Sequence, residues 1–419
     1  MRFVHFLAAI GTLLSLGAVS ARAGQPRFDS SGPEAALFGA AQHYPVGDRD
    51  SWGNPGYSVG SYTHFERIFP THRVERAAAP SPWRRSAHEP QIHYLFRGRT
   101  GTVDTYLAHF PATGLLLLQD DTILIERYQY GRNDSDRFTS NSMAKSIMAL
   151  LVGIAVKEGR IRSIDDHAAR YIPRMQGSLY GETSLRTLLQ MSSGIDFDYL
   201  TPAGVPSGDS RVLLKGSFAP HSDLAAQLAA VNRRVAPPRA KFHYSGGDNL
   251  TVGIALRRAL GVPLAEYLSA KIWKPIGAEA DATWATDTSG QEYTFYGFNA
   301  TLRDYGRLGR LLAHDGAWNG RQIVPRQWMI EATTVRSTDH QVMPGVATPY
   351  YGYGYQIWIL PGARRMFVLR GSDSQYIFVD PQSKLVLVQA ALRSEAPNAE
   401  NGLSETLALW LALVKQMGD

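Results

Sequence analysis

The sequence contains no cysteine in 419 residues. Disulfide bonds, thiol nucleophiles and cysteine-ligated metal ions are therefore excluded. It also lacks a His-Glu-x-x-His segment, which marks zinc proteases. The histidines are scattered, and Pro90 interrupts any helical ligand spacing between His88 and His93. We expect neither a metal ion nor another cofactor.

A strong charge of one sign is also absent. The formal net charge is +6, from 43 basic and 37 acidic residues distributed along the chain. A surplus this small is poor evidence for nucleic-acid binding, so no nucleic-acid partner is expected. The composition is that of a globular protein, and the length favours two lobes or one domain with an insertion.

Long hydrophobic runs are confined to the N-terminus. Residues 6–19 are apolar, Arg2 precedes them, and the small-x-small triplet Ala21-Arg22-Ala23 follows. This layout predicts a signal peptide over residues 1–23 that is cleaved before Gly24. The run is too short to favour a membrane span. We therefore expect a secreted or periplasmic protein.

The order of apolar patterns predicts a mixed architecture. Residues 24–90 show no sustained period and are expected to form an irregular extension. Apolar, β-rich runs on both sides of Asp120-Asp121 predict a hairpin, and residues 351–391 contain short strand-like runs separated by turns. An amphipathic helix is predicted at the C-terminus.

These patterns indicate an α/β fold of the α+β type. We expect an antiparallel sheet flanked by helices and built from both ends of the chain, residues 91–160 and 285–419. A mostly helical lobe is expected as an insertion over residues 161–284. A site would lie between the sheet and the inserted lobe.

Ser142 and Lys145 stand three residues apart at the start of a predicted helix, in the segment FTSNSMAKSIMALLVGIAVKEGRI. Residues i and i+3 share a helix face, so the amine can reach the hydroxyl. A serine nucleophile needs a base, and lysine serves only where its neutral amine is populated. The alternative is a helix cap at Ser142 and a solvent-exposed ammonium at Lys145.

Seven segments, in order, resemble the penicillin-recognising serine hydrolases. That family includes class C β-lactamases, D,D-peptidases, related esterases and 6-aminohexanoate-dimer hydrolases. The resemblance runs from about residue 95 to the end and implies a β-lactamase/transpeptidase-like fold. The segments are FTSNSMAKS, LLQMSSGIDFD, FHYSGGDNLTVG, KIWKPIGAEADATW, GFNATLRDYGRLGRLL, YGYGYQIWIL and LRGSDSQYIFVDP.

The resemblance implies roles for individual residues. Ser142 corresponds to the acylated nucleophile and Lys145 to its base. Tyr244 corresponds to the tyrosine that relays the proton to the leaving group. The backbone amides of Ser142 and Ser372 correspond to the two oxyanion donors.

Two departures from the family's pattern bear on the substrate. The lactamases and peptidases have Asn two residues after the tyrosine, where this chain has Gly246. They have Lys-Thr-Gly or His-x-Gly where this chain has Leu369-Arg370-Gly371. The missing groups help to hold β-lactam or peptide substrates, so their absence favours an ester or a small amide.

Four residues are further candidates for substrate contact. Arg370 either offers a cation to an anionic substrate or is a solvated strand residue, and Gly371 follows it in the third motif. Tyr199 either lines the mouth of the cleft or is a surface aromatic residue. Asn299 either bonds the substrate or caps the helix that follows it.

The sequence thus predicts a secreted serine hydrolase that acts on a small ester or amide through an acyl-enzyme, without a cofactor. One alternative is a β-lactamase or D,D-peptidase acting on cell-wall-related substrates. The other is a non-catalytic receptor with a penicillin-binding-like fold. The presence of Ser142, Lys145 and Tyr244 together favours an enzyme over a receptor.

Overall fold

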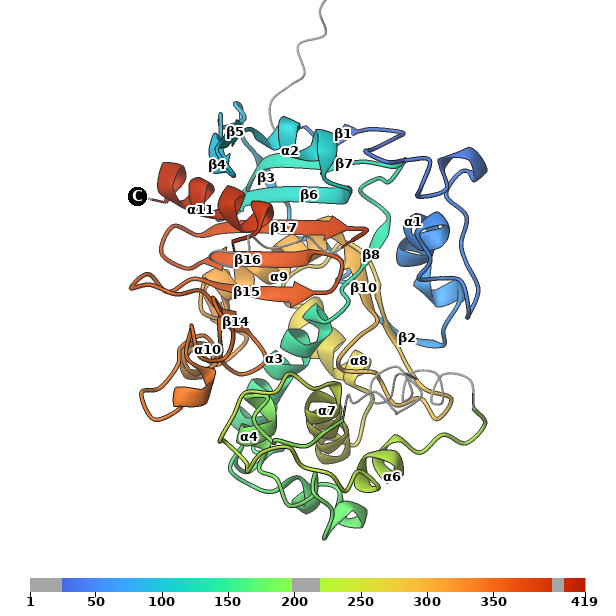
Figure 1. Cartoon of the computed structure of the whole chain (residues 1–419), viewed down its shortest axis with the longest axis vertical. Helices are drawn as coiled ribbons and strands as arrows, with labels where there is room; N and C mark the ends of the chain where they lie inside the picture. The colour runs from blue at the N-terminus through green and yellow to red at the C-terminus, as the bar shows by residue number, and fades with distance from the viewer. Residues whose placement is uncertain (1–24, 198–218, 394–402, 419) are drawn as a thin grey trace, which may run out of the picture.

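The computed structural model describes residues 25–197, 219–393 and 403–418. Its centre is a nine-stranded sheet in which β6 lies between β7 and β17 and is antiparallel to both (Figure 1). Strands from the first third of the chain therefore pair with strands from its end. The strands of this sheet are β1 (Arg27–Phe28), β3 (Arg84–Arg85), β7 (Thr122–Tyr128), β6 (Ala112–Gln119), β17 (Leu385–Ala391), β16 (Gln375–Asp380), β15 (Phe367–Gly371), β14 (Trp358–Ile359) and β13 (Gly352–Tyr353).

Helices cover both faces of the central sheet. Because successive residues of a strand point to opposite faces, Leu115 and Leu117 of β6 belong to a different apolar cluster from Leu116 and Leu118. The first pair packs with α2 (Val103–His109) and α11 (Glu405–Met417), and the second pair packs with α9 (Leu302–Ala313). Figure 1 shows α2 and α11 on the near face and α9 behind the sheet. Burial on both faces explains the unbroken leucine run in β6.

A helical lobe adjoins the sheet, and α3 (Met143–Lys157) runs from one to the other (Figure 1). The apolar residues of α3 are buried throughout, from Met143 to Ala155. The other helices of this region are α4 (Leu185–Leu189), α6 (Leu224–Ala229), α7 (Gly246–Leu260) and α8 (Leu264–Leu268). Helix α10 (Arg326–Ala332), from a later part of the chain, also packs on α3.

A second, four-stranded sheet contains β8, the strand that leads into α3. Its order is β2 (Thr71–Val74), β9 (Ala282–Ala285), β10 (Phe298–Thr301) and β8 (Arg137–Thr139). Two small hairpins, β4–β5 (Tyr94–Phe96 and Arg99–Gly101) and β11–β12 (Ala317–Trp318 and Arg321–Gln322), complete the described strands. The predicted fold class is confirmed, because helices flank a sheet built from both ends of the chain.

The N-terminal segment, residues 25–90, is attached to both sheets. Its strands β1 and β3 lie parallel to β7, and β2 pairs with β9. Helix α1 (Pro55–Thr63) lies between these attachments. Strands of two to four residues are too short to show a period, which explains why the sequence predicts only an irregular extension. The proposed domain limits at residues 91, 160 and 285 stay a prediction.

Two features concern the membrane and export. No helix among the described residues is long and apolar enough to cross a bilayer. The predicted signal peptide, residues 1–23, lies outside the described residues, as does Tyr199.

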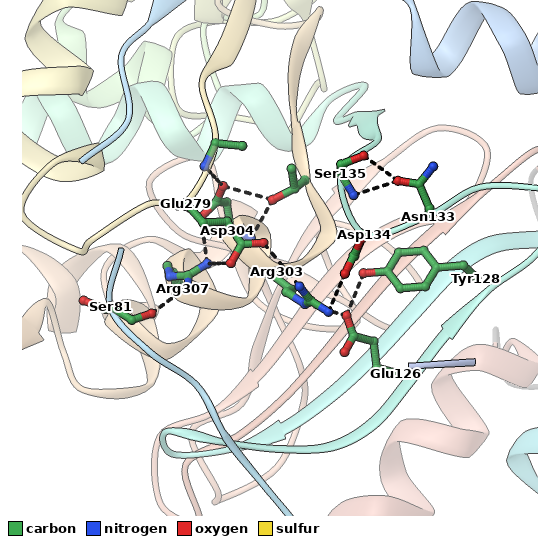
Figure 2. A network of polar contacts seen from close by, with 12 residues as sticks. Ser81, Glu126, Tyr128, Asn133, Asp134, Ser135, Glu279, Arg303, Asp304 and Arg307 are labelled. Atoms are coloured by element: carbon green, nitrogen blue, oxygen red, sulfur yellow. Dashed lines mark hydrogen bonds and ion pairs between the residues drawn. The ribbon is translucent and has the colours of Figure 1, made fainter. Parts of the chain in front are cut away.

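A buried ionic network ties α9 to the central sheet (Figure 2). Glu126 of β7 is fully buried, and Arg303 Nε of α9 donates to its Oε1 over 2.7 Å. Arg85 Nη1 of β3 donates to Oε2 over 2.8 Å, and the Tyr128 hydroxyl donates to Oε1 over 2.8 Å. One carboxylate therefore joins a helix, a central strand and the N-terminal segment.

The substitution Glu126→Gln removes the negative charge that both guanidinium groups share. Removing one side of a buried ion pair costs about 3 to 5 kcal/mol, so we expect the free energy of unfolding to fall by about 3 kcal/mol. Urea denaturation followed by circular dichroism measures this. Glu75→Gln is the control, because the Glu75 carboxylate pairs with Lys274 but is 59% exposed. An equal loss of stability in the two variants would contradict the role of burial.

Candidate active site

Ser142 lies at the junction between β8 and α3. It occupies the position before the first helical residue, with φ of −69°, and its side chain makes no capping hydrogen bond. The sequence left open whether this serine is merely a helix cap. In the structure its hydroxyl is not used as a cap and is instead paired with a lysine.

Lys145 is buried, with 2% of its surface exposed. Its Nζ lies 3.1 Å from Ser142 Oγ and 3.2 Å from the carbonyl oxygen of Phe295. Within the described residues, Lys145 forms no ion pair with a carboxylate. The structure therefore excludes the alternative of a solvent-exposed ammonium and directs the amine toward the serine.

Tyr244 stands on the other side of the amine. Lys145 Nζ lies 4.6 Å from the centroid of its ring. The ring stacks on Trp358 of β14 at 5.4 Å and meets Tyr353 of β13 edge-on at 6.1 Å. The next residue, Ser245, caps α7, because its side chain accepts a hydrogen bond from the amide of Asp248. The aromatic neighbours and the capped helix together hold Tyr244 beside Lys145.

The end of β15 passes directly against the nucleophile segment. A Cβ atom at Gly371 would lie 2.4 Å from the carbonyl oxygen of Ser140 and 2.9 Å from Asn141 Cβ. Any larger residue would separate the two segments. Among the described residues, neither the Ser142 amide nor the Ser372 amide donates a hydrogen bond to another protein group, so both remain available to an oxyanion.

Asn141 connects these two segments. Its φ is 43°, in the left-handed region that Asn tolerates better than most residues. Its Nδ2 donates to the carbonyl oxygen of Ser372 over 2.9 Å and lies 3.4 Å from Asp373 Oδ2. The residue before the nucleophile therefore holds the turn that carries the second predicted oxyanion donor.

Gln356 fixes the helices that carry the nucleophile and the tyrosine. Its carbonyl oxygen accepts a 2.5 Å hydrogen bond from Ser146 Oγ of α3. Its Oε1 accepts from Asn249 Nδ2 of α7 over 2.9 Å, and its Nε2 donates to the Leu189 carbonyl over 2.9 Å. One buried residue thus bridges α3 through its backbone carbonyl and α4 and α7 through its side chain.

The other predicted contacts lie in different surroundings. Arg370 is partly buried, with its guanidinium carbon 4.6 Å from the ring centroid of Tyr351 and 5.2 Å from that of Trp358. Asn299 is fully buried in β10, where its Nδ2 donates to Thr283 Oγ1 and to the Gly297 carbonyl. The cap of the following helix is Thr301 rather than Asn299.

Several residues at the site were not predicted from the sequence. Phe295 contributes its carbonyl oxygen and a ring whose centroid lies 5.5 Å from Lys145 Nζ, and it belongs to no motif that the sequence analysis singled out. Trp358 and Gln356 lie in the segment YGYGYQIWIL, which the resemblance marked without assigning a role to either. Asn141 directly precedes Ser142. The only sequence signal for its role was that asparagine tolerates a positive φ.

Comparison with known proteins agrees with this geometry. The family model described as Beta-lactamase matches residues 100–406. The 6-aminohexanoate-dimer hydrolase of Paenarthrobacter ureafaciens is 26% identical over 371 residues, which cover 86% of this chain and 91% of that protein.

Solved structures share the fold. A Bacillus anthracis protein proposed to be a 6-aminohexanoate-dimer hydrolase superposes with a TM-score of 0.78 at 24% identity, covering 88% of this chain and 97% of that one. A family VIII carboxylesterase superposes with a TM-score of 0.55 at 16% identity, covering 73% and 92%. The family predicted from the sequence motifs is therefore confirmed, and this chain belongs to the β-lactamase family of hydrolases.

Proposed function

We propose that this protein is a secreted serine hydrolase that cleaves small esters or amides through an acyl-enzyme on Ser142. The observation that carries the proposal is the buried amine of Lys145, 3.1 Å from the Ser142 hydroxyl. Within the described residues the amine has no carboxylate partner, and its nearest hydrogen-bonding groups are the Ser142 hydroxyl and the Phe295 carbonyl, so it is placed to exchange a proton with the serine.

The reaction follows from the positions of these groups. Ser142 Oγ attacks the substrate carbonyl while its proton passes to Lys145 Nζ. The negative charge on the carbonyl oxygen is stabilised by the amides of Ser142 and Ser372, each worth about 3 to 4 kcal/mol of the barrier. Tyr244, beside the amine, relays the proton to the departing alcohol or amine. Water then attacks the acyl-serine, returns a proton to the site and releases the acid.

The choice of a small ester or amide rests on the altered second and third motifs. Leu369 is fully buried in the core, where lactamases and peptidases present a lysine or histidine. Gly246 is the first residue of α7 and offers no side chain to a substrate. The relatives support this choice, because one is a 6-aminohexanoate-dimer hydrolase and another a carboxylesterase.

Arg370 is our candidate for the residue that meets an anionic group of the substrate. Its guanidinium shares Trp358 with Tyr244, so the cation and the relay tyrosine contact the same ring. Tyr199 and Gly371 stay candidates for contact with the substrate, and Asn299 is a weaker one because its amide already has partners in the small sheet.

The central test is covalent labelling. The mature protein is incubated with a fluorophosphonate and, separately, with a labelled penicillin, and the adduct is located by mass spectrometry. We expect the fluorophosphonate on Ser142, no label on Ser142→Ala, and hydrolysis of p-nitrophenyl acetate that depends on Ser142. Absence of both labelling and ester turnover would contradict the proposal. Penicillin labelling with nitrocefin turnover would instead identify a β-lactamase.

The substitution Lys145→Met tests the role of Lys145 as the base while leaving the fold intact. Methionine fills a similar apolar volume but cannot accept a proton, so we expect the ester hydrolysis rate to fall by at least about a hundredfold while the melting temperature is maintained. Lys157→Met, at the other end of the same helix, is the matched control and should retain activity. Comparable rates in the two variants would refute a role for Lys145 as the base.

Gly371→Ala tests the close approach of β15 to the nucleophile segment. The added Cβ meets the Ser140 carbonyl at 2.4 Å and must displace the turn that carries Ser372. Because loss of one oxyanion donor costs about 100-fold to 1,000-fold in kcat, we expect a loss in that range with a small change in KM. Gly53→Ala is the control, since nothing lies within 4 Å of its Cβ position. Wild-type kcat in Gly371→Ala would show that the contact is dispensable.

A further inference from the structure

Helix α1 of the N-terminal segment reaches the active site, although it precedes the region matched by the family model, residues 100–406. The hydroxyl of Tyr62, near the end of α1, donates a 2.8 Å hydrogen bond to Asp373 Oδ2. Asp373 directly follows Ser372 in the turn between β15 and β16. A residue 311 positions earlier in the chain therefore holds the turn of the second predicted oxyanion donor.

The turn has a conformation that needs external support. Asp373 and Ser374 have φ values of 56° and 59°, both in the left-handed region that is unfavourable for residues with a side chain. The Asp373 carboxylate accepts from Tyr62 on one side and lies 3.4 Å from Asn141 Nδ2 on the other. It thereby joins α1 to the residue before the nucleophile.

Tyr62 is itself held in place. Its ring lies 6.1 Å from that of Trp52, which in turn contacts the ring of Tyr296 edge-on at 5.8 Å. Tyr296 follows Phe295, whose carbonyl oxygen accepts from Lys145. The aromatic group Trp52, Tyr62 and Tyr296 therefore packs behind both the oxyanion turn and the acceptor of the catalytic amine.

The protonation states of the two residues make Tyr62 the donor and Asp373 the acceptor of this hydrogen bond. Burial, and then the Asp373 charge, raise the pKa of Tyr62 well above its ordinary value, so its hydroxyl remains a donor at neutral pH. Burial raises the pKa of Asp373, and the hydrogen bonds from Tyr62 and Asn141 oppose that rise. Both hydrogen bonds therefore favour the ionised carboxylate against the effect of its burial.

We infer that Tyr62 is a positioning residue for the oxyanion site, acting through Asp373 on the backbone amide of Ser372. The inference rests on the proposed function, because the Ser372 amide matters only if a negative charge develops on a substrate oxygen. Its consequence is that the N-terminal segment is part of the catalytic apparatus, in addition to its contacts with both sheets.

The test replaces only the hydroxyl. Tyr62→Phe keeps the ring contacts with Trp52, and Tyr57→Phe, an exposed tyrosine on the same helix, is the matched control. A displaced oxyanion donor weakens an interaction made in the transition state, so kcat should fall while KM changes little. We expect kcat for p-nitrophenyl acetate to fall about 10-fold to 100-fold in Tyr62→Phe, with a small fall in melting temperature from the lost hydrogen bond, and no change in kcat in Tyr57→Phe.

A double-mutant cycle tests the route through Asp373. Asp373→Gly removes the carboxylate and permits the positive φ of the turn. If Tyr62 acts through Asp373, adding Tyr62→Phe to Asp373→Gly should lower kcat by less than twofold. Full additivity of the two losses would overturn the inference, as would wild-type kcat in Tyr62→Phe.

The outcomes distinguish this inference from the proposed function. If the wild-type protein shows neither fluorophosphonate labelling of Ser142 nor ester turnover, the proposed function fails and the inference fails with it. If the wild type is labelled and active but Tyr62→Phe matches it in kcat, only the inference fails. A loss confined to KM would also overturn it, since a positioning role predicts a loss in kcat.

Discussion

The site depends on one constraint, the burial of the Lys145 amine beside the Ser142 hydroxyl, with no carboxylate paired to it among the described residues. Its polar and aromatic neighbours are the serine hydroxyl, the Phe295 backbone carbonyl and the aromatic faces of Tyr244 and Phe295. The apolar residues that bury α3 thus have a chemical role as well as a structural one. They make a helix of ordinary composition into the support for the base that we propose.

Three distant parts of the chain must meet for that constraint to be useful. Three specific contacts hold these parts together. The parts are the predicted nucleophile segment, the tyrosine before α7 and the turn after β15. Gly371 lets β15 approach the Ser140 carbonyl, Asn141 bonds the turn, and Gln356 joins α3 to α7. Each contact depends on a single glycine or amide residue, so each position admits few alternatives.

The N-terminal segment has two roles in this arrangement. It contributes strands to both sheets, and through Arg85 it takes part in the buried network around Glu126. Through Tyr62 it also reaches the oxyanion turn. A segment that carries no recognisable motif is therefore connected both to the scaffold and to the chemistry.

The sequence by itself determined the family, the fold class and the Ser-x-x-Lys pair, because each depends on local order: apolar periods, helix spacing and motifs in a fixed succession. It could not determine that Lys145 is buried, that Asn299 bonds within the small sheet, or that Tyr62 contacts Asp373. Those facts depend on which segments lie side by side, and a side chain's burial and partners are properties of its neighbours in space. Only the tertiary structure, by pairing β6 with β17 and placing α1 against the β15–β16 turn, decided them.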